Sequence, residues 1–221
     1  MNRIITNIVN INELTEKPCE SWIERFNDNG EIDAHEAFLK YDEYYYEWLY
    51  KHSNIDLISW EIENNCFNWE KHSLLVAKYC QDKFDYDKFN WKDYSWAVAE
   101  YYPDKIDPDK YNWEKDSWAI AQFCPDKFDS DKFNWEEYSD YVAQYCPEKL
   151  DPDKFNWKEE GRSVAKFCPD KLDPDRFNWK EHSDYVAQYC PDKLDPDKYN
   201  WEDCSWAVRY YCPDKLYSKK N

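Results

Sequence analysis

The chain has 221 residues and a formal net charge of −18, from 47 acidic and 29 basic side chains. Proteins that bind the phosphate backbone of nucleic acids need clustered Lys and Arg, so this balance excludes an ordinary nucleic-acid binder and disfavours docking on anionic lipids. Aromatic residues make up 20% of the chain, whereas disordered chains are poor in them, so the sequence predicts a folded protein.

The first 66 residues lack the periodicity that governs the rest of the chain. Segments 19–26 and 34–52 have the apolar spacing of helices, and Trp22, Phe38 and Trp48 supply apolar surface. The end of a repeat stack exposes a core face unless something covers it. We therefore expect residues 1–66 to form a helical cap; the alternative is that they form a functional head.

One segment of this region is similar to part of a calcium-binding EF-hand loop. Gly30, Ile32 and Glu36 fit the sixth, eighth and twelfth loop positions, but the first position, which should offer a carboxylate, is Arg25. The positive charge of Arg25 at the first loop position would repel calcium. The segment instead predicts a turn at Asn29-Gly30 followed by a helix.

From residue 67 onward, an aromatic-Asn-Trp triplet recurs every 22 residues without insertion. Its seven tryptophans are Trp69, Trp91, Trp113, Trp135, Trp157, Trp179 and Trp201. A fixed period of this length is typical of stacked structural units. The sequence therefore predicts an all-α fold, a tandem-repeat α-solenoid of seven units over residues 67–221 with a short charged cap at its end.

Each unit divides into a helix and a return segment. Counting the Trp as position 0, the preceding Asn is a favoured N-cap, and Glu181 lies three residues after Asn178 as in a capping box. Ser at +4, Val or Ile at +7, Ala at +8 and Cys at +11 fall on one helical face, which we expect to pack on its neighbours. Pro at +12 then predicts the end of a helix of about 12 residues.

The return segment carries apolar anchors at positions +15 and +20, with Asp-Pro-Asp-Lys between them in three units and close variants of it in three others. Asp can cap and Pro can start a short helical turn, so this tetrapeptide predicts a single 3₁₀ or α-helical turn. In layout, the alternation of α and 3₁₀ helices resembles the leucine-rich-variant type of solenoid. The sequence motifs differ from that family, so the resemblance implies nothing about function.

Residues for catalysis and for metal or cofactor binding are sparse. The two glycines exclude the usual phosphate-binding loops, and His72 and His182 occupy the same repeat position roughly 45 Å apart at about 9 Å per stacked helix. The cysteines show no Cys-x-x-Cys spacing, and six share position +11, which indicates core packing. We expect no cofactor, no metal and no enzymatic activity; the remaining place for catalysis is the cluster of Asp28, Asp33, His35 and Glu36.

Tryptophan at position +5 is a candidate for partner binding. Where this position is Trp96, Trp118 or Trp206, position +6 is Ala, whereas Asp140 and Asp184 at +5 are each followed by Tyr. One large aromatic side chain per unit therefore indicates compensation of volume in packing. The adjacent pair Trp96 and Trp118 remains an interaction candidate.

An acidic ladder recurs at positions +13, +16 and +18. The candidate partner-binding carboxylates are Asp85, Asp87, Asp107, Asp109, Asp129, Asp131, Asp151 and Asp153. Such a ladder can serve solubility, with Asp as turn former, or it can occupy a basic groove as a nucleic-acid mimic does. Carboxylates about 9 Å apart do not reproduce the phosphate interval of one strand, although their charge still steers association.

These observations favour a non-catalytic, cytoplasmic repeat protein without a leader or membrane span, which binds and blocks a basic surface of another protein. A nucleic-acid-handling protein is one candidate partner, in the manner of anti-restriction or anti-CRISPR inhibitors. The alternative is a general protein-interaction scaffold that uses its concave face or its aromatic head, with charge serving solubility. An enzyme with its site in residues 1–66 is the third hypothesis.

Overall fold

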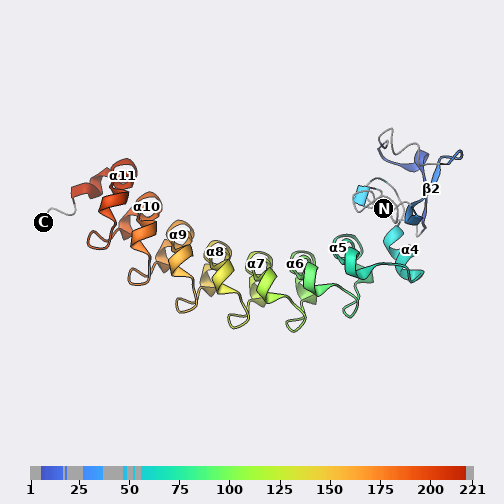
Figure 1. The fold of residues 1–221 in the computed structure, drawn as a ribbon, viewed down its shortest axis with the longest axis horizontal. Coiled ribbons are helices and arrows are strands. Elements are labelled where there is room, and N and C mark those ends of the chain that lie inside the picture. Colours follow the sequence, from blue (N-terminus) through green and yellow to red (C-terminus); the bar gives the residue numbers. More distant parts are fainter. Residues whose placement is uncertain are drawn as a thin grey trace. The chain divides into compact units, whose positions relative to one another are not determined.

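A computed structural model describes the fold of the chain (Figure 1). The described residues are 6–16, 18, 27–36, 47–48, 52 and 56–217. The chain divides into two compact units, residues 1–97 and 98–221, each of which is described by itself. The predicted all-α repeat solenoid is confirmed, because each repeat is an 11-residue α-helix that begins at its Trp and is followed by a 3₁₀ helix.

The repeat helices follow one another in strict register. The α-helices are α5 (Trp69–Tyr79), α6 (Trp91–Tyr101), α7 (Trp113–Phe123), α8 (Trp135–Tyr145), α9 (Trp157–Phe167), α10 (Trp179–Tyr189) and α11 (Trp201–Tyr211). The 3₁₀ helices are η2 (Gln81–Lys83), η3 (Pro103–Lys105), η4 (Pro125–Lys127), η5 (Pro147–Lys149), η6 (Pro169–Lys171), η7 (Pro191–Lys193) and η8 (Pro213–Tyr217).

The helices begin and end where the sequence predicts, but proline is not what ends them. In α7 the side chain of Asn112 accepts a hydrogen bond from the amide of Lys115, and the asparagines before α5 and α8 to α11 cap in the same way. The helices stop at position +10. Proline is not required for this stop, because α5 ends at the same position although Gln81 stands at its position +12.

The 3₁₀ helix lies earlier in the return segment than the sequence analysis placed it. In the sixth unit it occupies Pro191–Lys193, directly after α10, rather than the Asp-Pro-Asp-Lys segment. That segment instead forms a turn in which the amides of Lys198 and Tyr199 donate to the carbonyl of Asp195. Pro at position +12 thus starts the 3₁₀ helix, where its missing N–H leaves no bond unmade.

Within residues 98–221, helices α7 to α11 lie side by side, each packed on the next, with their return segments along one side of the stack (Figure 1). The Val or Ile at +7 and the Ala at +8 of these helices are buried, except that position +8 of α11 is the exposed Arg209. The aromatic residue at +20 lies against the Trp that follows, with ring centroids 5.1 Å apart for Phe133 and Trp135. Each interface between successive units therefore consists of small residues packed between the helices and of aromatic rings that pack against one another.

Hydrogen bonds between successive units repeat together with this packing. The amide of Asn156 donates to the hydroxyl of Ser139 in the unit before at 3.0 Å, and Asn156 Nδ2 donates to the carbonyl of Glu136 at 3.0 Å. The Ser139 hydroxyl in turn donates to the carbonyl of Trp135. Asn134 and Asn200 make the same two bonds to the units before them. Asparagine therefore both starts its own helix and ties it to the previous one.

Residues 1–97 contain a small sheet that the sequence analysis did not predict. Strand β1 (Ile8–Asn10) pairs antiparallel with β2 (Glu31–Asp33), with Val9 opposite Ile32. Helix α4 (Leu57–Glu63) is capped by Asp56. One apolar cluster contains residues of the two strands, of α4 and of the first repeat helix, α5. Its buried members include Val9, Ile32, Leu57, Ile58, Leu75 and Val76. The described N-terminal residues thus share a core with α5.

The predicted turn before β2 is present, although its continuation differs from the prediction. Asn27 accepts hydrogen bonds through its side chain from the amides of Asn29 and Glu31, and Gly30 has a positive φ of 73°. A three-residue strand follows the turn, and the helix begins only at Ala34. Arg25, on which the argument against calcium rests, lies outside the described residues. Gly30 is suited to the left-handed conformation that this turn requires.

Gly161 interrupts the serine column at position +4, and its replacement by Ser is expected to stabilise the protein. Serine would offer the amide of Asn178 a hydroxyl acceptor and would remove a helical glycine, together worth about 1–2 kcal/mol. A Cβ at this position would lie 3.3 Å from Phe177 Cδ2, which reduces the gain. Urea unfolding measures the free energy.

The matched control is Ser139→Gly, which removes the same two contributions from α8 and is expected to lower the unfolding free energy by a similar amount. If Gly161→Ser destabilised the chain while Ser139→Gly behaved as expected, steric contact with Phe177 would outweigh the hydrogen bond, and the explanation would be wrong for this position.

Candidate functional site

The ladder carboxylates at position +18 are exposed and form ion pairs between successive units. Lys132 Nζ lies 3.2 Å from Asp109 Oδ1, and Lys154 Nζ lies 2.5 Å from Asp131 Oδ1. Asp153 pairs with Arg176 and Asp175 pairs with Lys198 in the same register. In each of these pairs, the cation is at position +19 of the next unit and lies beside the carboxylate at +18. These cations neutralise much of the ladder's negative charge at short range.

The cation at +19 also holds the backbone of the preceding unit. Lys132 Nζ donates to the carbonyl of Pro108 at 3.2 Å, and Lys154 Nζ donates to that of Ser130 at 3.1 Å. A second row of pairs runs parallel to the first, with Lys193 Nζ 3.5 Å from Asp170 and Lys215 Nζ 3.2 Å from Asp192. Exposed pairs of this kind contribute little stability individually, but they fix where each charge lies.

The ladder carboxylates at position +16 form part of the turns. The side chains of Asp107, Asp129 and Asp151 each accept a hydrogen bond of 3.0 Å from the amide two residues later. In residues 1–97, Asp85 accepts from the amide of Asp87 in the same way. Of the eight candidate carboxylates, the four at +16 therefore stabilise turns, and the four at +18 carry the exposed charge.

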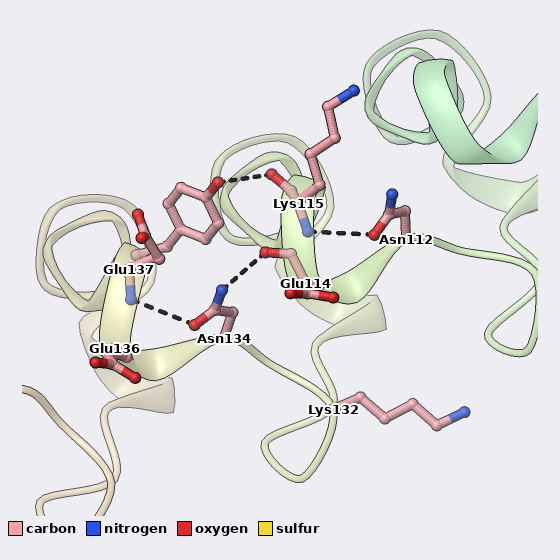
Figure 2. A pocket seen from close by; sticks show the side chains of 8 residues that line it. Asn112, Glu114, Lys115, Lys132, Asn134, Glu136 and Glu137 are labelled. Carbon is pink, nitrogen blue, oxygen red and sulfur yellow. Dashed lines mark hydrogen bonds between the residues drawn. The ribbon is translucent and has the colours of Figure 1, made fainter.

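Shallow depressions between the helix N-termini form a second repeated surface feature. One, of about 790 Å³, lies between α7 and α8 and is lined mainly by Glu114, Lys115, Lys132, Glu136 and Glu137. Figure 2 shows that its floor is made by the cap hydrogen bonds of Asn112 and Asn134 and by the bond from Asn134 to the carbonyl of Glu114. Cations and carboxylates alternate there, so the depression offers no single charge for a ligand.

The candidate tryptophans have different surroundings. Trp118 is half-buried, and its ring centroid lies 5.7 Å from that of Tyr141 on the neighbouring helix α8. Trp206, in the last repeat, is 54% exposed. Trp96 belongs to the first compact unit, where it is half-buried. In α7 and α8, therefore, a Trp at +5 meets a Tyr at +6 of the next unit, and the same Trp118 ring also lies 6.1 Å from that of Phe123 in its own helix.

Position +10 carries an exposed aromatic side chain in every helix from α7 to α11, a feature that the sequence analysis did not identify. These five residues are Phe123, Tyr145, Phe167, Tyr189 and Tyr211, with exposures from 37% to 42%. Two of them contact a Tyr at position +6 of the same helix, with centroids 5.9 Å apart for Tyr141 and Tyr145 and 6.1 Å apart for Tyr185 and Tyr189. We call the residues at +6 and +10 of α8 and α10, together with Phe167 and Tyr211, the aromatic stripe.

An acidic row accompanies the aromatic stripe. Position +2 is Glu137, Glu159, Glu181 and Asp203 in α8 to α11, and all four side chains are exposed. Residues at +2, +6 and +10 follow one another on the same face of a helix, because their spacing of four places each over the last. The acids at +2 and the aromatic residues at +10 recur with the 22-residue period, so the sequence contains this pattern. A Tyr or Phe near the end of a helix can equally be interpreted as a core residue, however.

Buried thiols and one histidine have perturbed pKa values. Burial raises the pKa of Cys124 and Cys146 to about 12 and that of Cys168 and Cys190 to about 11. These thiols stay protonated at neutral pH and pack as small apolar groups. Burial, helped by the charge of Lys71, lowers the pKa of His72 to about 4, so this imidazole is neutral at pH 7.

The acidic cluster considered for catalysis has structural partners. Asp33 caps the helix that begins at Ala34, because its carboxylate accepts from the amides of His35 and Glu36. His35 Nδ1 lies 2.7 Å from a carboxylate oxygen of Glu61, whose side chain is buried. The sequence analysis did not foresee that Glu61 of α4 meets His35, because no local pattern joins residues 26 positions apart. Asp28 is exposed in the turn.

Comparisons with known proteins do not assign the chain, since no family model matches it and no curated protein or solved structure is significantly similar to it. Among the described residues, no three His, Cys, Asp or Glu side chains converge to hold a metal ion. In the same part of the chain, no helix is both long and apolar enough to cross a bilayer. The repeated surfaces are therefore the features of the molecule from which a function can be inferred.

Acidification is expected to destabilise the protein through His72. Its folded pKa of about 4 lies below the ordinary value of 6.5, so the unfolded chain binds the extra proton first. Stability is complete above pH 6.5 and falls as the pH drops towards 4, by on the order of 2–3 kcal/mol. Urea unfolding between pH 4 and 7 measures it. His72→Gln should remove this part of the pH dependence. If the variant shows the same pH profile of the unfolding free energy, a group other than His72 causes the loss of stability.

The ladder ion pairs predict a depressed pKa for Asp131. The hydrogen bond and charge of Lys154 hold it below its usual value, so its small contribution to stability is present above pH 4 and is lost as the pH falls through its folded pKa. We expect the carbon-13 carboxyl signal of Asp131 to titrate at a higher pH in Lys154→Met. Lys180→Met, which changes a helix residue, should leave that signal unchanged. Equal titration in all three proteins would exclude the pair in solution.

Proposed function

We propose that this chain is a non-catalytic repeat protein that binds a basic surface of another protein and blocks it. The observation that carries the proposal is the repetition of exposed carboxylates on successive helices of residues 98–221, at position +2 on the helices and at +18 on the returns. A stack of this kind offers an extended surface rather than a pocket, and its net negative charge attracts cationic partners.

The ion pairs within the ladder refine how such a surface binds. A carboxylate that already faces a lysine adds little net charge at contact distance, so Asp109 and Asp131 contribute mainly to the wider field. Strict imitation of a nucleic-acid strand is therefore a weaker form of the proposal than general attraction of a basic surface. A nucleic-acid-handling protein remains one candidate partner because its binding groove is basic.

A general interaction scaffold is the second candidate function, favoured by the exposed aromatic stripe. Tyr and Trp are enriched in protein interfaces because they offer a large rigid area with a polar tip. Under this alternative, the charge serves solubility alone, and the binding of a partner would not depend on salt.

Affinity capture from a lysate tests the proposed function, at about 50 and 300 mM salt and with competing nucleic acid. We expect basic proteins to bind at the lower salt and to be released at the higher. The triple variant Asp109→Lys, Asp131→Lys, Asp153→Lys keeps the turn-capping aspartates and should weaken capture about tenfold or more at low salt.

The matched control exchanges both partners of one pair, as Asp131→Lys with Lys154→Asp, which preserves the net charge and the ion pair. It should bind like the unchanged protein. Capture that resists salt and survives the triple variant would contradict the proposal and favour the scaffold.

A further inference from the structure

The aromatic stripe and the acidic row form columns on single helices. In α8 the column is Glu137, Tyr141 and Tyr145, and in α10 it is Glu181, Tyr185 and Tyr189. Helices α9 and α11 also have an acid at +2 and an aromatic ring at +10, but their residue at +6 is small. These acids and rings are Glu159 and Phe167 in α9, and Asp203 and Tyr211 in α11. Four neighbouring helices therefore each present a carboxylate and an aromatic ring on one face.

A carboxylate near an aromatic face is a site for a cationic side chain. The guanidinium of Arg stacks on aromatic rings while its N–H groups bond a carboxylate, and an ammonium is attracted to the ring face within about 6 Å. In α10 the acid and the two rings are spaced by single helical turns, about 6 Å between successive Cβ atoms, whereas in α8 the backbone departs from helical geometry at Tyr138, between Glu137 and Tyr141. A cationic side chain on the ring at +6 can thus reach the acid one turn away at +2, whereas a ring at +10 lies about 12 Å along the helix from that acid and offers the cation its ring face.

The protein itself shows a cation seated on this stripe. Lys166 Nζ of α9 lies 4.6 Å from the ring centroid of Phe167 and 5.8 Å from that of Tyr189 on α10. Both rings are among the exposed residues at +10. The stripe is therefore accessible to an ammonium group at the distance that cation–π attraction requires.

We propose that the columns of α8 to α11 bind an extended cationic segment of another protein, with one Arg or Lys side chain on each helix. This inference rests on the proposed function and names the surface that performs it. A second copy of the chain is a poor occupant, because a net charge of −18 on each copy repels the other. Charge complementarity thus selects a basic partner.

The spacing of the helices predicts the spacing of the cations. Packed helices lie about 8–10 Å apart, and a polyproline II segment repeats every three residues, or about 9 Å. A segment in that conformation with Arg at every third residue would place one side chain on each successive column. Arginines at adjacent positions would reach the same columns only by distorting the segment.

A synthetic peptide tests both the spacing and the surface. The probe is about 12 residues long, with Arg at every third position and Ser and Pro between, because this composition favours polyproline II. A second peptide has the same composition with its arginines adjacent. Fluorescence anisotropy at about 50 mM salt is expected to give several-fold tighter binding for the spaced peptide.

Variants at position +10 test the aromatic contribution. Tyr145→Leu with Tyr189→Leu keeps apolar area but removes the rings, and we expect the spaced peptide to bind about tenfold more weakly. Tyr145→Phe with Tyr189→Phe keeps the rings and should retain binding. Tyr86→Leu changes an exposed Tyr of the first compact unit and serves as the control for surface hydrophobicity. Circular dichroism establishes that each variant keeps its helices.

Two further variants test the charges. Lys166→Gln removes the resident cation from the rings of Phe167 and Tyr189, so the spaced peptide should bind a few-fold more tightly. Glu137→Gln with Glu181→Gln should weaken binding and reduce its dependence on salt.

The outcomes separate this inference from the proposed function. If the wild-type chain captures a basic protein and the Leu variant captures it equally well, the proposed function stands and the stripe is the wrong surface. Equal affinity for the two peptides would overturn the predicted spacing. If neither a basic protein nor either peptide binds the wild-type chain at low salt, the proposed function fails together with the inference.

Discussion

Within residues 98–221, the hydrogen bonds of the asparagine before the tryptophan set the register between successive units, as at Asn134, Asn156 and Asn200. Through its side-chain oxygen this residue caps its own helix, while its two kinds of N–H reach a serine hydroxyl and a carbonyl of the unit before. Each such bond contributes only about 1 kcal/mol. Their geometry nevertheless allows one arrangement of neighbouring units, because an inserted residue would move the asparagine away from both acceptors. This constraint accounts for a period of 22 residues without a single insertion.

The same register produces the order of the protein surface. Because successive units of residues 98–221 meet in the same way, a cation at position +19 lies beside the carboxylate at +18 of the unit before, as Lys154 does at Asp131. The acidic ladder is thus a by-product of stacking as much as a binding feature. Its exposed pairs are screened by salt and contribute little to stability, so the core of Val, Ala and aromatic side chains holds the units together.

The repeat could be predicted because its determinants are local. Asn caps, the Trp start and the apolar face lie within one helix, and all three are where the sequence indicates. The hairpin could not be predicted in this way, since Ile8–Asn10 and Glu31–Asp33 are three-residue strands whose pairing depends on contacts distant in sequence. The position of the 3₁₀ helix was wrong for a local reason: Pro at +12 was interpreted as a stop, although it also suits the first turn of a new helix.

The two faces of a repeat differ in how their charges combine, and this difference bears on the site. On the return segments, carboxylates and cations alternate between neighbours, so adding a unit adds pairs. On the helical face, the row of Glu137, Glu159, Glu181 and Asp203 has one sign in four successive units, although Glu159 pairs with Lys158 at 3.0 Å. The ring at +10, two helical turns from each of these carboxylates, supplies apolar area that the ladder lacks. A cationic partner meets resident lysines on both faces, Lys158 and Lys166 on the helices and the lysines at +19 on the returns, and on the helices it also contacts exposed aromatic rings.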